Sequence, residues 1–365
     1  MNAEQKIATH FAHTEAELTI TEFGDGVIND TFLVYYTPVG SETKVKFILQ
    51  KINKNVFPEP SKVMQNLRVL LDFITSKNLA ENAKLVFPEI ISTHENIDYH
   101  IDENGDYWRA ISFIEGSQSF NTVSNIEQAR LAGECLGRFH NLVHDLPLKR
   151  IYDTLPGFHI TPTYVQAFRK SLVVLSKRKS SAMLDHGIEF ANKRLNGCAV
   201  LQEAINDKLV ITRVIHGDPK LNNFLFNQKG DKVLSLIDLD TITPGLVHYD
   251  IADCLRSLCN RSGEDSNDIN DVSFDLDICA ATLGAWMGEA RNFMTLQDYQ
   301  FIYPAVRLLP LELGLRFLTD YLGRNKYFKI EYPEQNLERA IVQFKLVYDI
   351  EQKEDEIQDI ISQCL

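Results

Sequence analysis

The sequence predicts an α+β protein of two lobes, a small antiparallel β-rich lobe followed by a larger, mainly helical lobe. Before about residue 115, short segments alternate apolar and polar residues as strands do. After it, most segments repeat apolar residues at helical spacing, and the pattern changes at Gly116. A chain of 365 residues can form two such cores. We expect the lobes to span residues 1–115 and 116–365 and to act as one catalytic unit.

The first lobe is expected to contain one hairpin, further strands and two helices. Gly24-Asp25-Gly26 separates the first two strands and predicts the turn of the hairpin. Ser61 is a suitable N-cap for the longer helix. In order, we expect a helix over 5–13, strands over 18–23, 31–36 and 45–50, a helix over 62–76, and strands over 85–93, 97–102 and 107–114, with Asn104-Gly105 joining the last two.

The second lobe reads as helical except over residues 209–240, where short apolar segments indicate strands around loops. Its first helix carries Gly133 and Gly137. Because each glycine lowers helix propensity, we interpret the pair as allowing a close helix contact. The expected helices span 126–143, 163–176, 180–205, 276–293, 298–322 and 334–361.

Charge and cysteine content exclude several classes of protein. The formal net charge is −13, so the surface should repel nucleic acid and anionic membranes. A nucleotide is not excluded, because a metal ion can offset its charge. The six cysteines form no CxxC pair or zinc pattern and read as reduced, mostly buried thiols. The chain has no signal-like start and no run of ~18 apolar residues, so we expect a cytoplasmic protein.

Three polar residues have the order and spacing that phosphoryl transfer requires. Asp218 lies in His216-Gly-Asp-Pro-Lys-Leu-Asn-Asn223, and Asn223 follows it by five positions. Asp238 ends an apolar strand. One carboxylate could orient or deprotonate an acceptor hydroxyl, and the amide and the other carboxylate could hold Mg²⁺. Alone, each would read as a turn, loop or strand-end residue. Together they favour a phosphoryl-transfer site.

The segment from Gly24 to Thr31 is weaker evidence. Its glycines could let the backbone approach nucleotide phosphates. Taken alone, it reads as a hairpin turn, and only its position between the first two strands makes it useful.

At these residues the sequence resembles the aminoglycoside phosphotransferase and choline kinase superfamily. The H-G-D-x-x-x-x-N loop of the family matches 216–223, and its I-D-x-[DE] loop matches 237–240. The resemblance implies a two-lobed protein-kinase-like fold, with ATP and Mg²⁺ as cofactors. It also implies that Asp218 is the catalytic base and that Asn223 and Asp238 hold Mg²⁺. The residues expected at the nucleotide are Gly26, Asn29, Thr31 and Gln50, with Phe113 and Ile114 at the hinge that contacts adenine.

Within that superfamily, the sequence is similar to the N-acetylhexosamine 1-kinase branch over most of its length. This similarity implies transfer of the ATP γ-phosphate to the anomeric hydroxyl of GlcNAc or GalNAc. The segments that carry it are Gly24–Asn29 with Thr31, Phe47–Asn53, Lys220–Asn223, Ile237–Gly245, Leu315–Leu322 and Tyr332–Leu337.

One position departs from the general kinase pattern. The third strand usually ends in a lysine that binds the α- and β-phosphates and pairs with a helix glutamate, but Gln50 stands there. Lys51 follows, and strand alternation points it to the opposite face. The helix expected over 62–76 also lacks glutamate. We interpret this as a trait of the branch; the alternative is a catalytically silent nucleotide-binding module.

The acceptor site should combine carboxylates and amides for hydroxyl groups with an aromatic face. Arg316 and Asp320 are four apart on an expected helix and share a face, although a surface ion pair is the alternative. Asp250 and Asp253, with Arg256 as a partner, are expected to brace the catalytic loop. The expected substrate residues are Asp240, Arg316, Asp320, His159 and Tyr321.

The sequence leaves the acceptor open. An aminoglycoside, choline or another sugar remains an alternative to the N-acetylhexosamine. We expect ATP and a small molecule as partners, with no nucleic acid, membrane or obligate protein partner.

Overall fold

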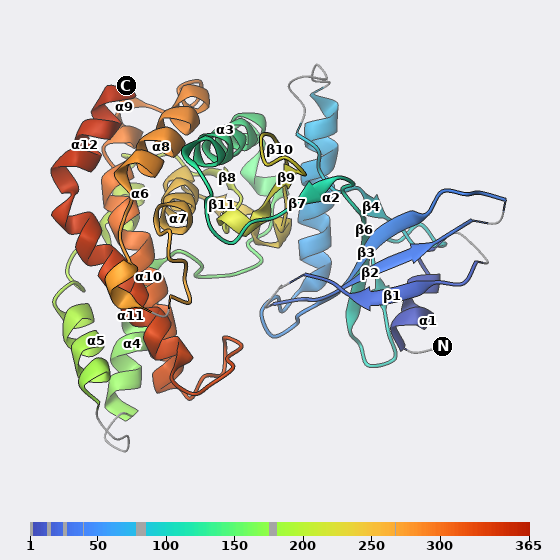
Figure 1. Ribbon diagram of the computed structural model, residues 1–365, viewed down its shortest axis with the longest axis horizontal. Helices are drawn as coiled ribbons and strands as arrows, with labels where there is room; N and C mark the ends of the chain where they lie inside the picture. The colour runs from blue at the N-terminus through green and yellow to red at the C-terminus, as the bar shows by residue number, and fades with distance from the viewer. Residues whose placement is uncertain are drawn as a thin grey trace. The chain divides into compact units, whose positions relative to one another are not determined.

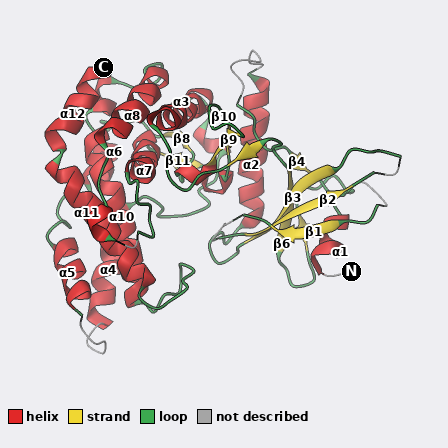
Figure 2. Ribbon diagram, viewed as in Figure 1, coloured by secondary structure: helices red, strands yellow, loops and turns green. Residues whose placement is uncertain are grey.

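The computed structural model describes residues 3–12, 16–24, 28–38, 40–77, 85–174, 181–266 and 268–365 (Figure 1). Helices and one antiparallel sheet dominate it, which confirms the predicted α+β class (Figure 2). The chain forms two compact units. The first consists of Met1–Ser117, Lys149–Leu155 and Leu239–Thr243, and the second contains the remaining residues.

The first unit is built on a six-stranded sheet in which β1-β2-β3-β6-β4 are neighbours and β5 also pairs with β6. All of these pairs are antiparallel. The register places Thr31 opposite Gln50, and Gln50 opposite Arg109. The elements are α1 (Ala3–Thr9), β1 (Thr19–Glu22), β2 (Asp30–Tyr36), β3 (Val45–Ile52), α2 (Pro60–Ser76), β4 (Ile90–Ile91), β5 (His100–Ile101) and β6 (Tyr107–Ser112).

Helix α1 packs on this sheet through a small apolar core. Ile7 and Phe11 are buried together with Val34, Phe47 and Leu49 from the strands. Lys51 lies on the face of β3 that carries Phe47 and Leu49, opposite to Gln50, as strand alternation predicts. Its Nζ lies 3.3 Å from a carboxylate oxygen of Asp30.

Some expected boundaries in the first unit were wrong. Helix α1 ends at Thr9, and two of the expected strands shrink to the two-residue β4 and β5. Ser61 is not the N-cap, because α2 begins at Pro60 and Glu59 occupies the capping position without a side-chain bond. Proline favours the first turn of a helix because its fixed φ suits that turn and its missing N–H is not needed there.

The second unit is mainly helical, and α10 packs against α4, α7 and α11. The strand region predicted between residues 209 and 240 is present. The elements are α3 (Ile126–Val143), α4 (Thr161–Val174), α5 (Ala182–Asn192), α6 (Val200–Asn206), β8 (Arg213–Ile215), β9 (Phe224–Asn227), β10 (Val233–Leu236), α7 (Val247–Cys259), α8 (Leu276–Ala290), α9 (Leu296–Tyr299), α10 (Ile302–Leu322), α11 (Gln335–Gln352) and α12 (Glu354–Gln363), with β7 (Ser117–Gln118) and β11 (Thr243–Gly245) at the boundaries between units.

Three expected long helices are each divided in two. The segment expected over 180–205 forms α5 and α6, that over 298–322 forms α9 and α10, and that over 334–361 forms α11 and α12. Helix α7 was not predicted at all.

The glycines of α3 allow close contact with α8, as predicted. A Cβ built on Gly133 would lie 2.1 Å from the carbonyl oxygen of Thr282. One built on Gly137 would lie 2.9 Å from the carbonyl oxygen of Trp286. Both distances are shorter than van der Waals contact, so only glycine fits at this crossing.

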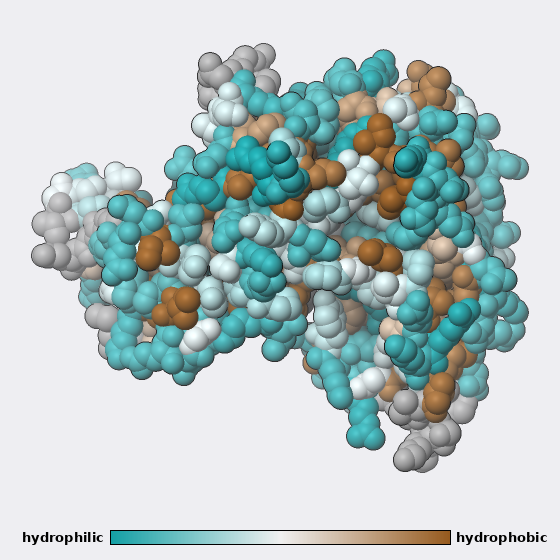
Figure 3. All heavy atoms as spheres, turned by 180° about the vertical axis from the view of Figure 1, so that it is seen from behind, coloured by the Kyte–Doolittle hydropathy of each residue, from teal (hydrophilic) through white to brown (hydrophobic). Residues whose placement is uncertain are grey.

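The cysteines and the surface agree with the composition. All six cysteines are free, and five are buried. On the described part of the face drawn in Figure 3, hydrophilic residues predominate and hydrophobic ones form small separate groups. Among the described residues, no helix is both long and apolar enough to cross a membrane.

Gly133→Ala should destabilise the protein by about 1–3 kcal/mol or more, because the added methyl group must displace backbone of α8. Gly288→Ala is the matched control, since a Cβ there meets nothing within 4 Å. It should be neutral or stabilising by about 0.4–1 kcal/mol. Urea unfolding followed by circular dichroism measures both, and equal effects of the two changes would contradict the close contact.

Candidate active site

The predicted catalytic loop connects β8 to β9 and brings Asp218 and Asn223 together. The side-chain amide of Asn223 donates to the backbone oxygen of Asp218 at 2.7 Å, with a longer contact of 3.4 Å to its carboxylate. The backbone oxygen of Asn223 accepts from the N–H of Ile237 at 2.9 Å. The loop therefore orients the Asn223 amide and ties it to the segment that ends in Asp238.

Asp250, in the first turn of α7, braces this loop as predicted. Its two carboxylate oxygens accept from the backbone N–H groups of His216 at 2.7 Å and Gly217 at 2.8 Å. His140 Nε2 lies 2.8 Å from the same carboxylate, while Trp286 Nε1 donates to His140 Nδ1. Burial opposes ionisation of Asp250, but its hydrogen bond with His140 and the neighbouring charges outweigh burial and lower the carboxyl pKa.

Lys220 controls the charge of Asp218. Its Nζ lies 2.9 Å from Asp218 Oδ2. Burial disfavours the ionised carboxylate, but Lys220, His216 and Arg256 outweigh it and hold the pKa of Asp218 below its usual value. An ionised carboxylate is what a proton acceptor at this position needs. Lys220 stands at a variable position of the motif, so the motif assigned it no role. The signal in the sequence that could have identified it is a basic residue two positions after the aspartate.

Asp238 and Asn223 offer the oxygen ligands that Mg²⁺ prefers. Asp238 follows β10 with φ of +64°, a left-handed conformation that is uncommon outside glycine. Within the described ranges, no cluster of three or more His, Cys, Asp or Glu could hold a metal by itself. Mg²⁺ commonly binds one or two protein groups and completes its octahedron with phosphates and water. This donor set fits that mode.

The described residues expected at the nucleotide all belong to the first unit, where Thr31 and Gln50 are bonded to each other. Gln50 Nε2 donates to Thr31 Oγ1 at 3.0 Å, and Asn29 Oδ1 accepts from the backbone N–H of Asn53 at 3.0 Å. In the hinge segment, the ring of Phe113 packs edge-on against Phe23. The backbone oxygen of Ile114 accepts from Ser117 Oγ at 2.6 Å. Gly26 lies outside the described residues.

Asp240 does not present a free carboxylate. It is buried, and one oxygen lies 2.5 Å from Arg109 Nη1 while the other accepts from Asn29 Nδ2 at 2.8 Å. Both oxygens therefore already bind protein groups. This arrangement favours a structural role over the sugar contact expected from the sequence.

Asp320 is also committed to protein atoms. Its carboxylate accepts from the backbone N–H groups of Lys326, Tyr327 and Phe328 at 2.8–3.0 Å. Asn336 Nδ2 adds a fourth hydrogen bond at 3.0 Å. Asp320 thus shapes the loop after α10 and does not pair with Arg316. Tyr321, beside it, is half-buried in the last turn of α10.

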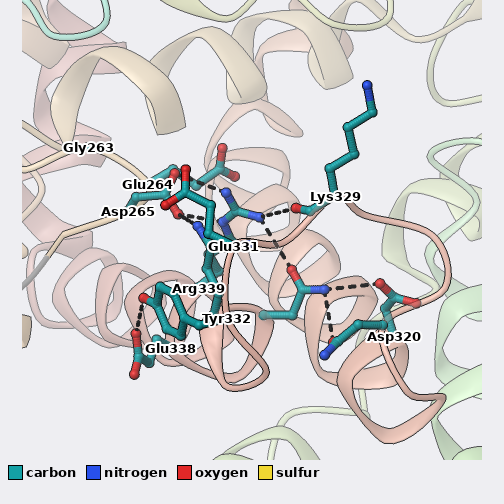
Figure 4. A network of polar contacts seen from close by, with 12 residues as sticks. Gly263, Glu264, Asp265, Asp320, Lys329, Glu331, Tyr332, Glu338 and Arg339 are labelled. Atoms are coloured by element: carbon teal, nitrogen blue, oxygen red, sulfur yellow. Dashed lines mark hydrogen bonds and ion pairs between the residues drawn. The ribbon is translucent and has the colours of Figure 1, made fainter. Parts of the chain in front are cut away.

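The same loop is fixed from α11 (Figure 4). Arg339 binds both carboxylate oxygens of Asp265, at 2.5 and 3.1 Å, and donates to the backbone oxygen of Lys329 at 3.2 Å. Asn336, from the same helix, binds Asp320. The loop between α10 and α11 is therefore held by side chains at both of its ends.

Arg316 lies among four aromatic rings that this loop and α4 help to place. Its guanidinium carbon is 5.4–5.8 Å from the ring centroids. Across the part of the chain that the structure describes, the guanidinium has no hydrogen bond or ion pair. It is therefore a cation available to a ligand. The four rings belong to Phe158, Tyr164, Tyr327 and Phe328.

His159 holds the catalytic loop from a second side. Its Nδ1 lies 3.0 Å from Glu312 Oε1, and its Nε2 lies 2.8 Å from the backbone oxygen of Gly217. Because both neighbours are acceptors, the ring binds best with a proton on each nitrogen. Burial opposes that charge, but Glu312 outweighs it and raises the pKa of His159. These contacts favour positioning of the loop over the substrate contact expected for His159.

His159→Asn should destabilise the protein by about 3–5 kcal/mol at pH 6, because Glu312 loses its buried partner. Asparagine tolerates the left-handed backbone found there, with φ of +57°. The folded-state pKa of His159 is raised, so its stabilising contribution is complete below about pH 6.5 and declines as pH rises through the folded-state pKa. The stability gap between wild type and variant should therefore shrink at higher pH.

Urea unfolding between pH 6 and pH 9 measures this gap. His186→Asn is the control, because His186 is exposed on α5. A gap that stays constant or widens with pH would contradict a charged His159.

Comparison with solved structures supports the fold. An aminoglycoside phosphotransferase from Alicyclobacillus acidocaldarius is 16% identical, with a TM-score of 0.60 over 98% of this chain and 97% of that one. A spectinomycin phosphotransferase in complex with ADP and spectinomycin is 14% identical, with a TM-score of 0.57 over 98% and 99%. Choline kinase from Cryptosporidium parvum is 15% identical, with a TM-score of 0.55 over 95% and 91%.

The sequence itself matches a family over most of its length. Residues 19–309 match the phosphotransferase enzyme family, and this range includes the catalytic loop, Asp238 and the bracing Asp250. The resemblance drawn from the two motifs is thereby confirmed at the level of the family. The chain belongs to the phosphotransferase enzyme family.

Proposed function

We propose that the protein is an ATP- and Mg²⁺-dependent kinase that phosphorylates the anomeric hydroxyl of an N-acetylhexosamine, GlcNAc or GalNAc, to give the sugar 1-phosphate. The observation that carries the reaction type is the braced loop in which Lys220 and Asn223 bind Asp218. We assign nucleotide binding to the β-rich lobe over residues 1–115, and catalysis and acceptor binding to residues 116–365.

In this reaction Asp218 accepts the proton of the acceptor hydroxyl while the hydroxyl oxygen of the acceptor forms a bond to the γ-phosphorus. The bond from that phosphorus to the ADP oxygen breaks, and ADP leaves. Asn223 and Asp238 would hold Mg²⁺, which supplies charge neutralisation of the phosphates. Lys220 neutralises Asp218 before the acceptor binds and then offers its ammonium group to the transferred phosphoryl group.

The charge of the acceptor site supports a neutral substrate. Arg316 carries a positive charge that no protein carboxylate pairs with among the described residues. It can donate to a hydroxyl or acetamido oxygen, whereas it repels an ammonium group. The carboxylate of Asp253 is buried and already paired, with Oδ1 2.7 Å from Arg256 Nε, so it offers no free negative charge to an ammonium group. The half-exposed ring of Tyr327 can cover a sugar face.

The alternative is an amine-bearing acceptor, such as an aminoglycoside or choline. The similarity of the fold to aminoglycoside phosphotransferases and choline kinase motivates it. The unpaired Arg316 argues against it. A catalytically silent module was motivated only by Gln50, and Asp218, Asn223 and Asp238 are all retained.

Asp218→Asn should lower kcat for the acceptor about 10²–10⁴-fold, because the amide cannot accept the proton. Nucleotide affinity should stay within about twofold, since only the proton acceptor changes. Steady-state kinetics and calorimetric titration of ADP measure the two effects. Asp207→Asn, the same change at an exposed position at the end of α6, should leave both unchanged. Undiminished turnover by Asp218→Asn would refute the assigned base.

Arg316→Met should raise the acceptor KM about 10–100-fold, because it removes a charged hydrogen-bond donor, and leave the KM for ATP unchanged. ATP consumption should be tested with GlcNAc, GalNAc, free hexoses, an aminoglycoside and choline. Arg324→Met, at an exposed arginine after α10, is the control. Turnover with amines alone, or an Arg316→Met acceptor KM equal to wild type, would overturn the assignment of a neutral sugar.

A further inference from the structure

The sheet carries a chain of hydrogen bonds at the position where Gln50 stands. Thr31, Gln50 and Arg109 lie side by side on β2, β3 and β6. Gln50 Nε2 donates to Thr31 Oγ1, and its Oε1 accepts from Arg109 Nε at 3.0 Å and Nη2 at 2.8 Å. The Gln50 amide thus donates one hydrogen bond to β2 and accepts two from the guanidinium of Arg109 on β6.

The guanidinium of Arg109 also forms a buried ion pair with Asp240. Arg109 and Asp240 are each 3% exposed, and Arg109 Nη1 lies 2.5 Å from Asp240 Oδ1. Asn29 donates to the other carboxylate oxygen. A buried pair is tolerated when its remaining donors and acceptors are satisfied, as they are here. A lysine at position 50 would place a second cation against Arg109 and repel it. The neutral glutamine at position 50 is therefore what allows an arginine at position 109.

This pair anchors the chain directly after Asp238. Residues Leu239–Thr243 belong to the first unit, and Asn66 of α2 donates to the backbone oxygen of Ile242 at 3.1 Å. Thr154 Oγ1 donates to the backbone oxygen of Asp240 at 3.2 Å. Asp238, two residues before Asp240, keeps a left-handed backbone that costs about 1–2 kcal/mol. Anchored neighbours are needed to hold such a conformation.

We propose that Arg109, through Asp240, is the positioning residue that takes over from the absent third-strand lysine, and that it does so by fixing the Mg²⁺-binding aspartate Asp238. The neutral Asn66 on α2 replaces the helix glutamate in linking that helix to the same segment. Each side-chain nitrogen of Arg109 binds a protein acceptor, so it acts on Asp238 and not on the phosphates. This inference rests on the proposed function.

The consequence is a nucleotide affinity that depends strongly on Mg²⁺. A lysine would attract the phosphates directly, with or without the metal. Here the buried Arg109 holds the proposed Mg²⁺ ligand Asp238 in place. Loss of Arg109 should therefore weaken binding of ADP in the presence of Mg²⁺ and leave binding of ADP without Mg²⁺ unchanged.

Calorimetric titration of ADP in the presence of Mg²⁺ or of EDTA, each in about tenfold excess, tests the inference without turnover. Arg109→Gln should weaken binding with Mg²⁺ about tenfold or more and change binding in EDTA less than about twofold. Gln50→Lys/Arg109→Gln, which rebuilds a lysine able to reach Asp240, should recover at least part of the loss. Arg68→Gln is the matched control, because it breaks another arginine–aspartate pair of the first unit, with Asp98.

Wild-type affinity in the folded Arg109→Gln variant, or equal losses with and without Mg²⁺, would overturn the inference while leaving the proposed function intact. Wild-type protein that fails to bind ADP with Mg²⁺ would overturn both. If Arg109→Gln does not fold, Gln50→Leu decides, because it keeps the ion pair and removes its support on β3. A threefold or greater loss (about 0.65 kcal/mol) of affinity with Mg²⁺, combined with a change of less than about twofold in EDTA, then supports the inference, whereas equal losses in both conditions overturn it. Unchanged affinity overturns it.

Discussion

The catalytic loop depends on the buried carboxylate of Asp250. A buried charge is strongly disfavoured unless hydrogen bonds replace its water. The backbone N–H groups of His216 and Gly217, with His140, provide those bonds. The same bonds fix the start of the loop that carries Asp218. The same hydrogen bonds therefore stabilise the buried carboxylate and fix the geometry of the loop. They form only when α3, α7 and α8 pack together, because His140 on α3 is itself held by Trp286 on α8.

Other acidic residues around the site act in the same way. Asp240 engages Arg109 and Asn29, Asp320 engages three backbone N–H groups, and Glu312 engages His159 and Thr161. Each uses its carboxylate to hold a neighbouring segment. The strongly acidic composition thus serves the internal architecture as well as the surface. Carboxylates near this site cannot be assigned to substrate from their identity alone, because most of their oxygens are already occupied.

Local sequence patterns predicted the two-lobed class, the close packing at Gly133 and Gly137, and the loop with Asp218 and Asn223. They failed where long-range burial decides. Helix α7 was missed although Val247, Ile251 and Leu255 recur at helical spacing, and its polar residues, Asp250 among them, are buried as well because they bind other segments. The partners of Asp240 and Asp320 lie on other segments or on loop backbone, and spacing along the chain does not encode them. His159 could be singled out, but its partner Glu312 is 153 positions away.

Arg316 is the exception to this internal pairing, and its position explains why. Four aromatic rings surround its guanidinium, and their faces attract the cation without consuming its hydrogen-bond donors. The rings thus stabilise the charge and leave its N–H groups for a ligand. Asp320 fixes the loop that supplies two of these rings, Tyr327 and Phe328. A carboxylate in contact with Arg316 would have bound those donors itself. Asp320 instead orders the loop through its backbone N–H groups and leaves those donors unoccupied, which is what the proposed binding of an uncharged, oxygen-rich acceptor requires.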